Sequence, residues 1–386
     1  MPARKPFRPD WSETPPAPGT YRAIFKYGAP ARFKHPSDPW YAMLKAEFGM
    51  TDADFRRKRW EGREPLRLER PCGLAEGQVA ALTAIVGGEN VSTDVFQRTR
   101  YAYGKTAEEM MELGRGVVRE IADLVVHPRH KEDVRRIVGY CHTERIPVYV
   151  YSGGSSVTLG LRPARGGVTL VMSTHMNRFL ELNETNQTAR VEPGILGPAY
   201  EQALNQAPQR FGARRRYTGG HFPQSFEHST VGGWIVTLGS GQASTYYGDA
   251  ADLVVSQQYV TPTGGFTTLA FPAAATGPRV DDIMKGAEGA FGILVEVTLK
   301  IYRHMPRNRR YFSFMFPSWT AAVDASRAIA QGEFGRPAVY RISDPEETDR
   351  GLKLYGIPSL ADRFLIKRGY LPMQRCLCLG TTEGDG

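Results

Sequence analysis

The sequence lacks the features that would place it in a membrane-spanning or disulfide-stapled class. No apolar stretch approaches the roughly 18 residues that span a bilayer, and the first residues, MPARKPFRPDWSETPPAPG, carry no apolar signal-peptide core. Only four of 386 residues are cysteine, too few for a disulfide framework. Cys376 and Cys378 form a C-x-C pair without a second ligand pair, which favours two half-buried strand residues and no metal. We expect a protein of the reducing cytoplasm.

Acidic residues are the scarcer charge. Lys and Arg number 49 against 40 Asp and Glu, a net charge of +9. This excess favours phosphates, anionic lipid surfaces or nucleic acid as partners. The basic clusters Arg56–Arg59 and Arg214–Arg216 are short, and a solvated helix face or loop explains them better than a nucleic-acid surface. No zinc-finger, RRM or basic-zipper pattern accompanies them, so we expect no nucleic acid partner.

Proline and hydrophobic spacing predict the order of elements. Nine of the 27 prolines fall in the first 40 residues, which excludes a long helix and predicts an extended arm. The pattern from 61 to 125 stays unassigned. Beyond the arm, the spacing predicts helices at 40–60 (with Trp40, Leu44 and Phe48 on one face), 134–141, 196–207 and 320–331, and strands at 148–150, 167–172, 179–182, 188–191, 253–260, 266–269, 295–302, 312–316, 338–342 and 375–379. From residue 308 on, the predicted order of elements is strand, helix, strand. This order corresponds to half of a split βαβ sandwich.

Three runs are dense in glycine and hydroxyl residues. Ser152–Ser156 follows a predicted strand, where successive backbone N–H groups can form an anion-binding nest, although an ordinary tight turn would look the same. Gly219–Trp234 suits neither helix nor strand, and its backbone could press against a flat polar ligand. Gly286–Leu294 has three glycines at i, i+3 and i+6, which equally fits a glycine-faced helix start. None of them is a G-x-G-x-x-G dinucleotide fingerprint.

In this order and spacing the three runs resemble the FAD-linked oxidases of the vanillyl-alcohol oxidase (PCMH) type. Within that family the sequence is most similar to the alkylglycerone-phosphate (alkyldihydroxyacetone-phosphate) synthases, over most of 105–386. The specific part is GHFPQSFEHSTVGGW, followed by Thr237, Ser240-Gly241, Tyr247-Gly248 and Asp252–Val255. The resemblance implies an α+β fold with three parts: an N-terminal arm and helical extension at 1–104, a PCMH-type two-lobed FAD-binding domain at 105–305, and a partial, apparently truncated ferredoxin-like cap (substrate) domain at 306–386.

The resemblance also implies non-covalent FAD and its contacts. The first run would wrap the diphosphate, the second would line the diphosphate and the isoalloxazine side, and the third would close over the adenosine half. The expected cofactor-binding residues are Val150, Tyr151, Ser152, Gly153, Gly154, Ser155, Ser156, Gln224, Ser225, Phe226, Glu227, His228, Ser229, Thr230, Thr237, Leu238, Gly239, Ser240, Glu288, Gly289, Ala290, Phe291, Gly292, Ile293 and Leu294. His175 is a weaker candidate for the covalent flavin link that some relatives have.

Several positions depart from the family pattern. Val150, Tyr151 and Ser152 stand where its first loop has Pro, Ile and Gly. Gln224 replaces an Asp, Leu238 replaces an Arg, and Ala290-Phe291 replace Thr-Leu. Arg210–Tyr217 looks inserted. These changes leave the fold in place and leave affinity and substrate choice open.

The resemblance implies exchange of the acyl group of acyl-dihydroxyacetone phosphate for a fatty alcohol through a flavin N5 adduct, as in ether-lipid synthesis. His221 and Arg341 match catalytic candidates: a histidine can shuttle protons near neutral pH, and an arginine can clamp a phosphate. For each, a structural hydrogen bond or salt bridge is an equal alternative. Two other functions stay open, an FAD-linked dehydrogenase of a 2-hydroxy acid such as lactate or glycolate, and a non-catalytic flavin-binding protein.

The expected partners follow from that chemistry. They are a small-molecule or lipid-phosphate substrate, a membrane surface touched peripherally, and a second copy of the chain in a homodimer. The expected location is the cytoplasm, with peripheral membrane contact.

Overall fold

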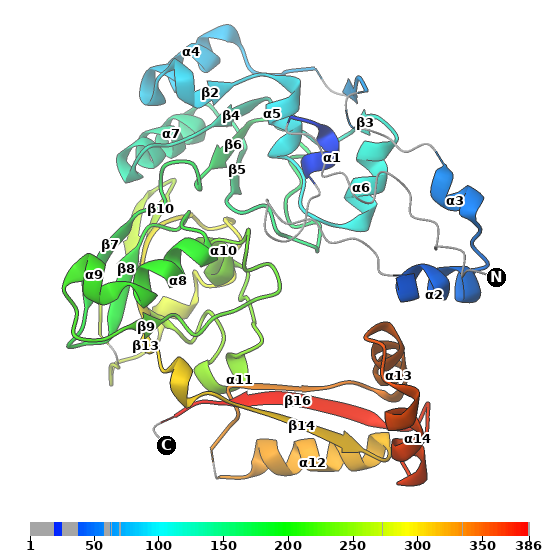
Figure 1. Ribbon diagram of the computed structural model, residues 1–386. Coiled ribbons are helices and arrows are strands. Elements are labelled where there is room, and N and C mark those ends of the chain that lie inside the picture. The colour runs from blue at the N-terminus through cyan, green and yellow to red at the C-terminus, as the bar shows by residue number, and fades with distance from the viewer. Residues whose placement is uncertain are drawn as a thin grey trace.

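The computed structural model describes residues 19–24, 38–57, 62, 64–68, 71–271, 273–333 and 335–384. Two neighbouring lobes carry sheets with helices packed against them, and a separate three-stranded sheet lies beneath them (Figure 1). Most of the predicted proline-rich arm falls outside the described residues. No helix in these ranges is both long and apolar enough to cross a bilayer.

Short elements precede the first lobe. They are α1 (Tyr21–Ile24), α2 (Asp38–Phe48), α3 (Asp52–Arg56), β1 (Arg67–Leu68), α4 (Glu76–Val86), η2 (Gly88–Asn90), β2 (Val91–Ser92), α5 (Val95–Arg100), α6 (Ala107–Gly114) and β3 (Val117–Val118). The helix predicted at 40–60 is two helices, α2 and α3. Its predicted apolar face is wrong, because Trp40 and Phe48 are exposed and Tyr41 is the buried residue of α2.

The first lobe is a four-stranded sheet in the order β2-β4-β6-β5. Its later elements are β4 (Leu124–Val126), α7 (Lys131–Thr143), β5 (Val148–Tyr151) and β6 (Val168–Val171). β4, β6 and β5 run parallel. The predicted apolar stripe of α7 is confirmed: Val134, Ile137, Val138 and Cys141 are buried in the core beneath the sheet. All three parallel strands therefore end at one edge, where α/β sheets bind ligands.

The second lobe is a five-stranded antiparallel sheet in the order β11-β10-β12-β8-β7. Its elements are β7 (Phe179–Asn183), β8 (Thr188–Val191), α8 (Gly197–Asn205), α9 (Ala207–Phe211), β9 (Tyr217–Thr218), α10 (Val231–Val236), α11 (Ser244–Tyr247), β10 (Val254–Thr261), β11 (Gly264–Thr267), η3 (Val280–Asp282), β12 (Ile293–Lys300) and β13 (Tyr302–Arg303). The predicted hairpin at 179–191 is confirmed, whereas α10 begins within Gly219–Trp234, which was predicted to be neither helix nor strand.

Strand β12 joins the two lobes. Its alternating sequence predicts a half-buried strand, but nearly the whole strand is buried. The reason is that both lobes use it: Val297 and Leu299 pack in the core of the second lobe, and Ile293 and Val295 pack in the core beneath the first. The alternation of apolar and polar residues along β12 therefore does not separate a buried face from a solvent-exposed face.

The cap sheet follows β13. Its elements are η4 (Pro306–Asn308), β14 (Arg310–Phe316), α12 (Trp319–Gln331), β15 (Val339–Ile342), α13 (Pro345–Leu354), α14 (Ser359–Lys367) and β16 (Cys376–Thr382). β16 lies between β14 and β15 and is antiparallel to both, so β14-α12-β15 is the predicted split βαβ unit. Cys376 and Cys378 are strand residues as predicted, but they are fully buried. Helices α13 and α14 were not predicted from the sequence.

A polar junction ties the cap to the second lobe. The hydroxyl of Tyr247 in α11 donates a 2.6 Å hydrogen bond to Glu383, which follows β16. Arg309, just before β14, donates to the same carboxylate at 2.6 Å. Tyr247 is buried and Glu383 is nearly so. The start of β14 and the end of β16 therefore meet α11 at one carboxylate.

A buried ion pair holds the other end of the cap. Arg375 donates from Nε to Asp349 of α13 at 2.8 Å, and both residues are only 3% exposed. A second bond from Arg375 reaches Asp362 of α14 at 2.6 Å. This arginine therefore fixes α13 and α14 against the first residue of β16.

We predict that Arg375→Met destabilises the protein by about 3–5 kcal/mol, because it leaves the Asp349 carboxylate buried without its partner. Arg327→Met is the matched control. It removes an exposed pair with Asp324, which is worth about 1 kcal/mol or less. Urea unfolding followed by circular dichroism measures both. Equal midpoints for the two variants would contradict the assignment.

Candidate functional site

One cavity of about 900 Å³ collects the three glycine- and hydroxyl-rich runs. It lies at the carboxyl end of β5, between the two lobes. Its size is at the upper end of the roughly 300–1,000 Å³ of small-molecule and cofactor sites. All but four of the residues predicted to bind the cofactor line it; the exceptions are Phe226, Glu227, His228 and Phe291. Phe226 stacks on the lining residue Trp234, His228 is half-buried, and Glu227 and Phe291 are exposed.

The first run lies against the backbone of the second. A Cβ built on Gly153 would stand 2.2 Å from the carbonyl oxygen of His228, so no side chain fits there. Gly154 has a φ of 63° and lies over the ring of Tyr151, in the left-handed region that favours glycine. The two glycines are therefore required by this contact and this turn.

Hydroxyl groups complete the contact between these runs. Thr230 donates from Oγ1 to Ser152 Oγ at 2.7 Å, and its oxygen accepts the N–H of Gly233 at 3.2 Å, which caps α10. Ser173, after β6, donates to the carbonyl of Ser152 at 2.9 Å. The loop after β5 is thus held from two sides by short side chains.

The third run is a loop and forms no helix, so the glycine-faced helix start is wrong. Glu288 has a φ of 48° and donates its N–H to the carbonyl of Val236 at 3.0 Å. Gly289 follows with a φ of 89°, and a Cβ there would lie 3.4 Å from Val150 of β5. Leu238 lies opposite with a φ of 51°. Left-handed backbone at non-glycine residues is costly and clusters at ligand sites.

The donors in this cavity are neutral. Among the described residues that line it, Glu288 is the one charged side chain, and no Lys or Arg is present. No acceptor in the described part of the chain takes the backbone N–H groups of Gly153, Gly154 or Ser155. Successive free N–H groups beside hydroxyls form an anion-binding nest. The residues present therefore fit a dinucleotide diphosphate held by backbone and hydroxyl donors.

His221 lies behind the cavity wall and does not line it. It is 3% exposed, and neither ring nitrogen has a hydrogen-bond partner within the described residues. The ring packs beside Trp234, with centroids 4.8 Å apart, and a Cβ on Gly239 would lie 3.5 Å from Nε2. Burial lowers the pKa of His221 to about 4, against a smaller opposing effect of Asp249. The imidazole is therefore neutral at pH 7.

Arg341 and His175 also lie outside the cavity lining. Arg341 is on β15 of the cap sheet, exposed, and paired with Glu347 of α13. His175, after β6, has Nε2 at 2.7 Å from the Asn90 side-chain oxygen. The structure therefore places none of His221, Arg341 and His175 among the residues that line the cavity.

Sequence reasoning missed part of the lining. The additional residues are Val148, Tyr149, Val157, Thr158, Gly160, Leu161, Met172, Pro193, Pro223, Gly232, Gly233, Trp234, Val236 and Ala287. Thr158 and Gly160 extend the composition of the first run and could have been included. Met172 and Pro193 come from other strands, and only tertiary structure brings them here.

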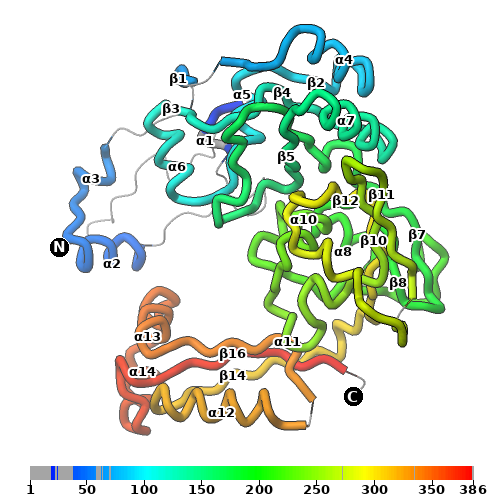
Figure 2. The backbone as a smooth tube through the Cα atoms, turned by 180° about the vertical axis from the view of Figure 1, so that it is seen from behind, coloured from blue at the N-terminus to red at the C-terminus, as the bar shows by residue number. Residues whose placement is uncertain are grey.

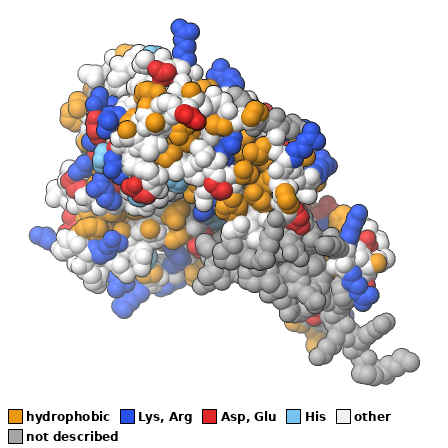
Figure 3. Space-filling model, turned by 90° about the horizontal axis from the view of Figure 1, so that it is seen from above, with side chains coloured by type: hydrophobic (Ala, Val, Ile, Leu, Met, Phe, Trp, Pro, Cys, Tyr) orange, Lys and Arg blue, Asp and Glu red, His pale blue; other side chains and the backbone are white. Residues whose placement is uncertain are grey.

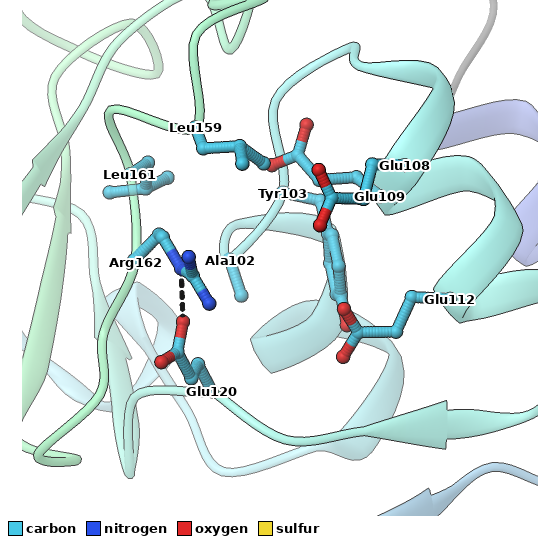
Figure 4. Close-up of a pocket in the computed structure, with 9 residues that line it drawn as sticks. All are labelled: Ala102, Tyr103, Glu108, Glu109, Glu112, Glu120, Leu159, Leu161 and Arg162. Carbon is cyan, nitrogen blue, oxygen red and sulfur yellow. Dashed lines mark hydrogen bonds and ion pairs between the residues drawn. The ribbon is translucent and has the colours of Figure 1, made fainter.

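A second, much smaller cavity lies beside α6 (Figure 4). It has about 30 Å³ and is lined by Glu108, Glu109, Glu112 and Glu120 around Tyr103 and Arg162. Arg162 is paired with Glu120. This space accommodates little more than ordered water. No group of three or more His, Cys, Asp or Glu within the described ranges is placed to hold a metal ion.

Comparison with known proteins agrees with this geometry. A family model described as an FAD binding domain matches residues 122–270. The alkyldihydroxyacetonephosphate synthase of Dictyostelium discoideum is 32% identical over 273 residues, which is 70% of this chain and 43% of that protein. The chain thus spans less than half the length of the curated relatives it matches.

Solved structures show the same fold. A structure of alkyldihydroxyacetonephosphate synthase matches with a TM-score of 0.72 at 29% identity, covering 82% of this chain and 57% of that chain. A structure of p-cresol methylhydroxylase with substrate bound matches with a TM-score of 0.57 at 17% identity. The match covers 82% of this chain and 62% of that chain. The second match concerns the fold alone.

We predict that Gly153→Ala weakens FAD binding at least tenfold, because the new methyl group must push the loop away from the His228 carbonyl. A tenfold loss needs only about 1.4 kcal/mol. Gly139→Ala in α7 is the control, since a Cβ there meets nothing within 4 Å. Flavin absorbance of the purified proteins and titration with FAD measure both. Equal affinity in the two variants would refute the close contact.

The buried imidazole predicts a pH-dependent stability. Because the pKa of His221 is lowered from 6.5 to about 4, the unfolded chain binds a proton between these values that the folded chain does not. The neutral His221 therefore contributes to the free energy of unfolding. This contribution is complete above pH 6.5 and is lost as the pH falls towards 4, by up to about 1.4 kcal/mol per pH unit. His221→Leu should flatten the curve of unfolding free energy against pH. An unchanged slope would show that the imidazole is accessible to solvent.

Fold, cavity and comparisons lead to one cofactor. The loops that line the cavity fit a diphosphate, residues 122–270 match an FAD-binding domain, and the matching structures share the two-lobed architecture. FAD is the cofactor of this domain. Residues 122–270 therefore form an FAD-binding domain, in a chain with the fold of alkyldihydroxyacetonephosphate synthase and p-cresol methylhydroxylase.

Proposed function

We propose that the protein is an FAD-dependent alkylglycerone-phosphate synthase. In this reaction a fatty alcohol replaces the acyl group of acyl-dihydroxyacetone phosphate. The alcohol oxygen becomes the ether oxygen, a fatty acid leaves, and no net oxidation occurs. The observation that carries the proposal is the match to synthases in both sequence and structure, at about 30% identity over most of this chain.

The chain's own residues supply the binding of the cofactor. The loop after β5 provides neutral donors for the diphosphate, and Glu288 to Leu294 close the opposite wall. Bound FAD supplies the reactive ring, as cofactors do in such enzymes.

The cap sheet offers a candidate phosphate contact. The Tyr340 ring lies beside that of Phe312 of β14, with centroids 6.5 Å apart, so the next residue of β15, Arg341, lies on the opposite face of the sheet. On that face Arg341 is in register with Leu379 of β16, and Leu379 with Ser313 of β14. An arginine beside an apolar side chain suits a substrate that carries a phosphate and an acyl chain.

We also propose that the protein is cytoplasmic and touches membranes peripherally. The support is the lipid nature of the proposed substrate and the net charge of +9. On the face shown in Figure 3, Lys and Arg side chains are spread around the outline and interleaved with acidic ones. This distribution gives a diffuse attraction to anionic surfaces.

The first test separates exchange from oxidation. The FAD-loaded chain should convert acyl-dihydroxyacetone phosphate and a labelled fatty alcohol into labelled ether product and free fatty acid. Anaerobic addition of lactate or glycolate should leave the flavin absorbance unchanged. Bleaching by a 2-hydroxy acid would instead support a dehydrogenase, and bound flavin without either activity would support a non-catalytic protein.

The second test addresses the phosphate contact. Arg341→Met should raise the KM for acyl-dihydroxyacetone phosphate about 10- to 100-fold, because a charge-assisted hydrogen bond contributes about 1.5–3 kcal/mol. FAD content should not change. Arg327→Met on α12 is the control and should leave KM unaltered. An unchanged KM in Arg341→Met would show that this arginine does not contact the substrate and serves only in its ion pair with Glu347.

A further inference from the structure

Helix α14 is almost unpacked. It lies with α13 at the end of the cap sheet far from the C-terminus, away from the cofactor cavity (Figures 1 and 2). Its nine residues include none that is buried. Helices of this length depend on packing for their stability. What holds α14 is the ion pair between Asp362 and Arg375 described above, which lies on one side only.

The opposite side of α14 combines large apolar and basic side chains. Leu360, Arg363, Phe364 and Lys367 are spaced i, i+3, i+4 and i+7, so they share one helix face. Leu360 is 73% exposed and Phe364 is 57% exposed. Arg368, just after the helix, places its guanidinium 5.0 Å from the centre of the Phe364 ring. We call these five residues the basic-apolar face.

The cations of this face are not neutralised. Asp362 is the one acidic residue of α14, and its carboxylate is already bound by Arg375. Arg363, Lys367 and Arg368 have no ion pair with any carboxylate in the part of the chain that the structure describes. Three unpaired cations therefore surround two exposed apolar side chains.

Neighbouring segments extend the apolar surface. Tyr355, after α13, is 93% exposed, and Leu371 and Met373, after α14, are also exposed. Lys353, in the last turn of α13, adds a further exposed cation beside Tyr355. Exposed apolar groups gathered at one end of a domain indicate an interaction site.

We propose that the basic-apolar face docks on an anionic phospholipid surface. An interfacial helix places aromatic and aliphatic side chains at the acyl boundary and its cations among the headgroups, and each cation strengthens binding to an anionic leaflet. A second copy of the same face would be repelled by its charge, and a nucleic acid would leave Leu360 and Phe364 uncovered. The inference does not depend on the proposed reaction, because vesicle binding requires no turnover.

Vesicle co-sedimentation of the FAD-loaded full chain tests the proposal. The chain should bind phosphatidylcholine vesicles that contain about one-third phosphatidylglycerol, and bind pure phosphatidylcholine at least tenfold more weakly. Arg363→Glu with Lys367→Glu, and separately Leu360→Ser with Phe364→Ser, should each reduce binding at least tenfold. Flavin content and circular dichroism verify that the variants are folded.

Matched controls lie on helices α6 and α7, outside the cap. Arg136→Glu changes an exposed cation of α7, and Met111→Ser changes an exposed apolar residue of α6; both should bind like the unaltered chain. Equal losses of vesicle binding in the control variants would contradict the proposal, because they would show that net charge and not the basic-apolar face determines binding. Failure of the unaltered chain to bind the anionic vesicles would overturn the proposal, as would dimerisation that Phe364→Ser abolishes.

Insertion can be measured separately from adsorption. Leu360→Trp places a reporter on the basic-apolar face, and its emission should shift to shorter wavelength with anionic vesicles. Met111→Trp should show no shift. Binding without a shift at position 360 would mean that charge alone holds the protein at the surface, which contradicts docking of the apolar side chains.

Discussion

The arrangement of this protein depends on one backbone contact, between the loop after β5 and the segment before α10. At Gly153 the two chains are so close that a single methyl group would stand 2.2 Å from the His228 carbonyl oxygen. The same contact brings Thr230 within hydrogen-bond distance of Ser152. Because the loop belongs to the first lobe and α10 to the second, this contact closes the cavity wall on one side. Strand β12, buried in the cores of both lobes, closes it on the other.

The lining is neutral although the protein is basic. A diphosphate in this cavity would meet backbone N–H groups and hydroxyls, and among the described residues that line it Glu288 is the one charged side chain. Backbone N–H groups and hydroxyls are fixed dipoles that can bind an anion. No Lys or Arg side chain then has to lose its hydration on burial in the site. Leu238, which stands where the family has an arginine, follows the same pattern. The excess of Lys and Arg therefore lies outside the site, on the surface and on the cap, where it can act on substrates and membranes.

The sequence predicted α7, β5 and β6 of the first lobe because local patterns determine them, whereas β2 and β4 fall largely in the stretch that stayed unassigned. The stripe of α7 and the run at Ser152–Ser156 depend on neighbours in sequence, and most residues of the three runs line one cavity. The predictions failed where tertiary contacts decide. β12 alternates in sequence but is buried on both sides, α10 forms from glycine-rich sequence because Thr230 caps it, and Met172 reaches the cavity from another strand. His221 and Arg341 match a family pattern, but spacing alone cannot say whether a side chain faces a cavity.

The cap and the cavity wall are connected by a short path of contacts. Glu383 binds Arg309 and Tyr247, which joins the start of β14 and the end of β16 to α11. The Tyr247 ring in turn fills the space beside Gly220, where a Cβ would lie 2.6 Å from Cγ of the tyrosine. Gly220 precedes His221, whose ring packs on Trp234 in the wall. A displacement of the cap sheet must therefore move Tyr247, and with it the segment behind the cofactor, so the position of Arg341 and the shape of the cavity are set together.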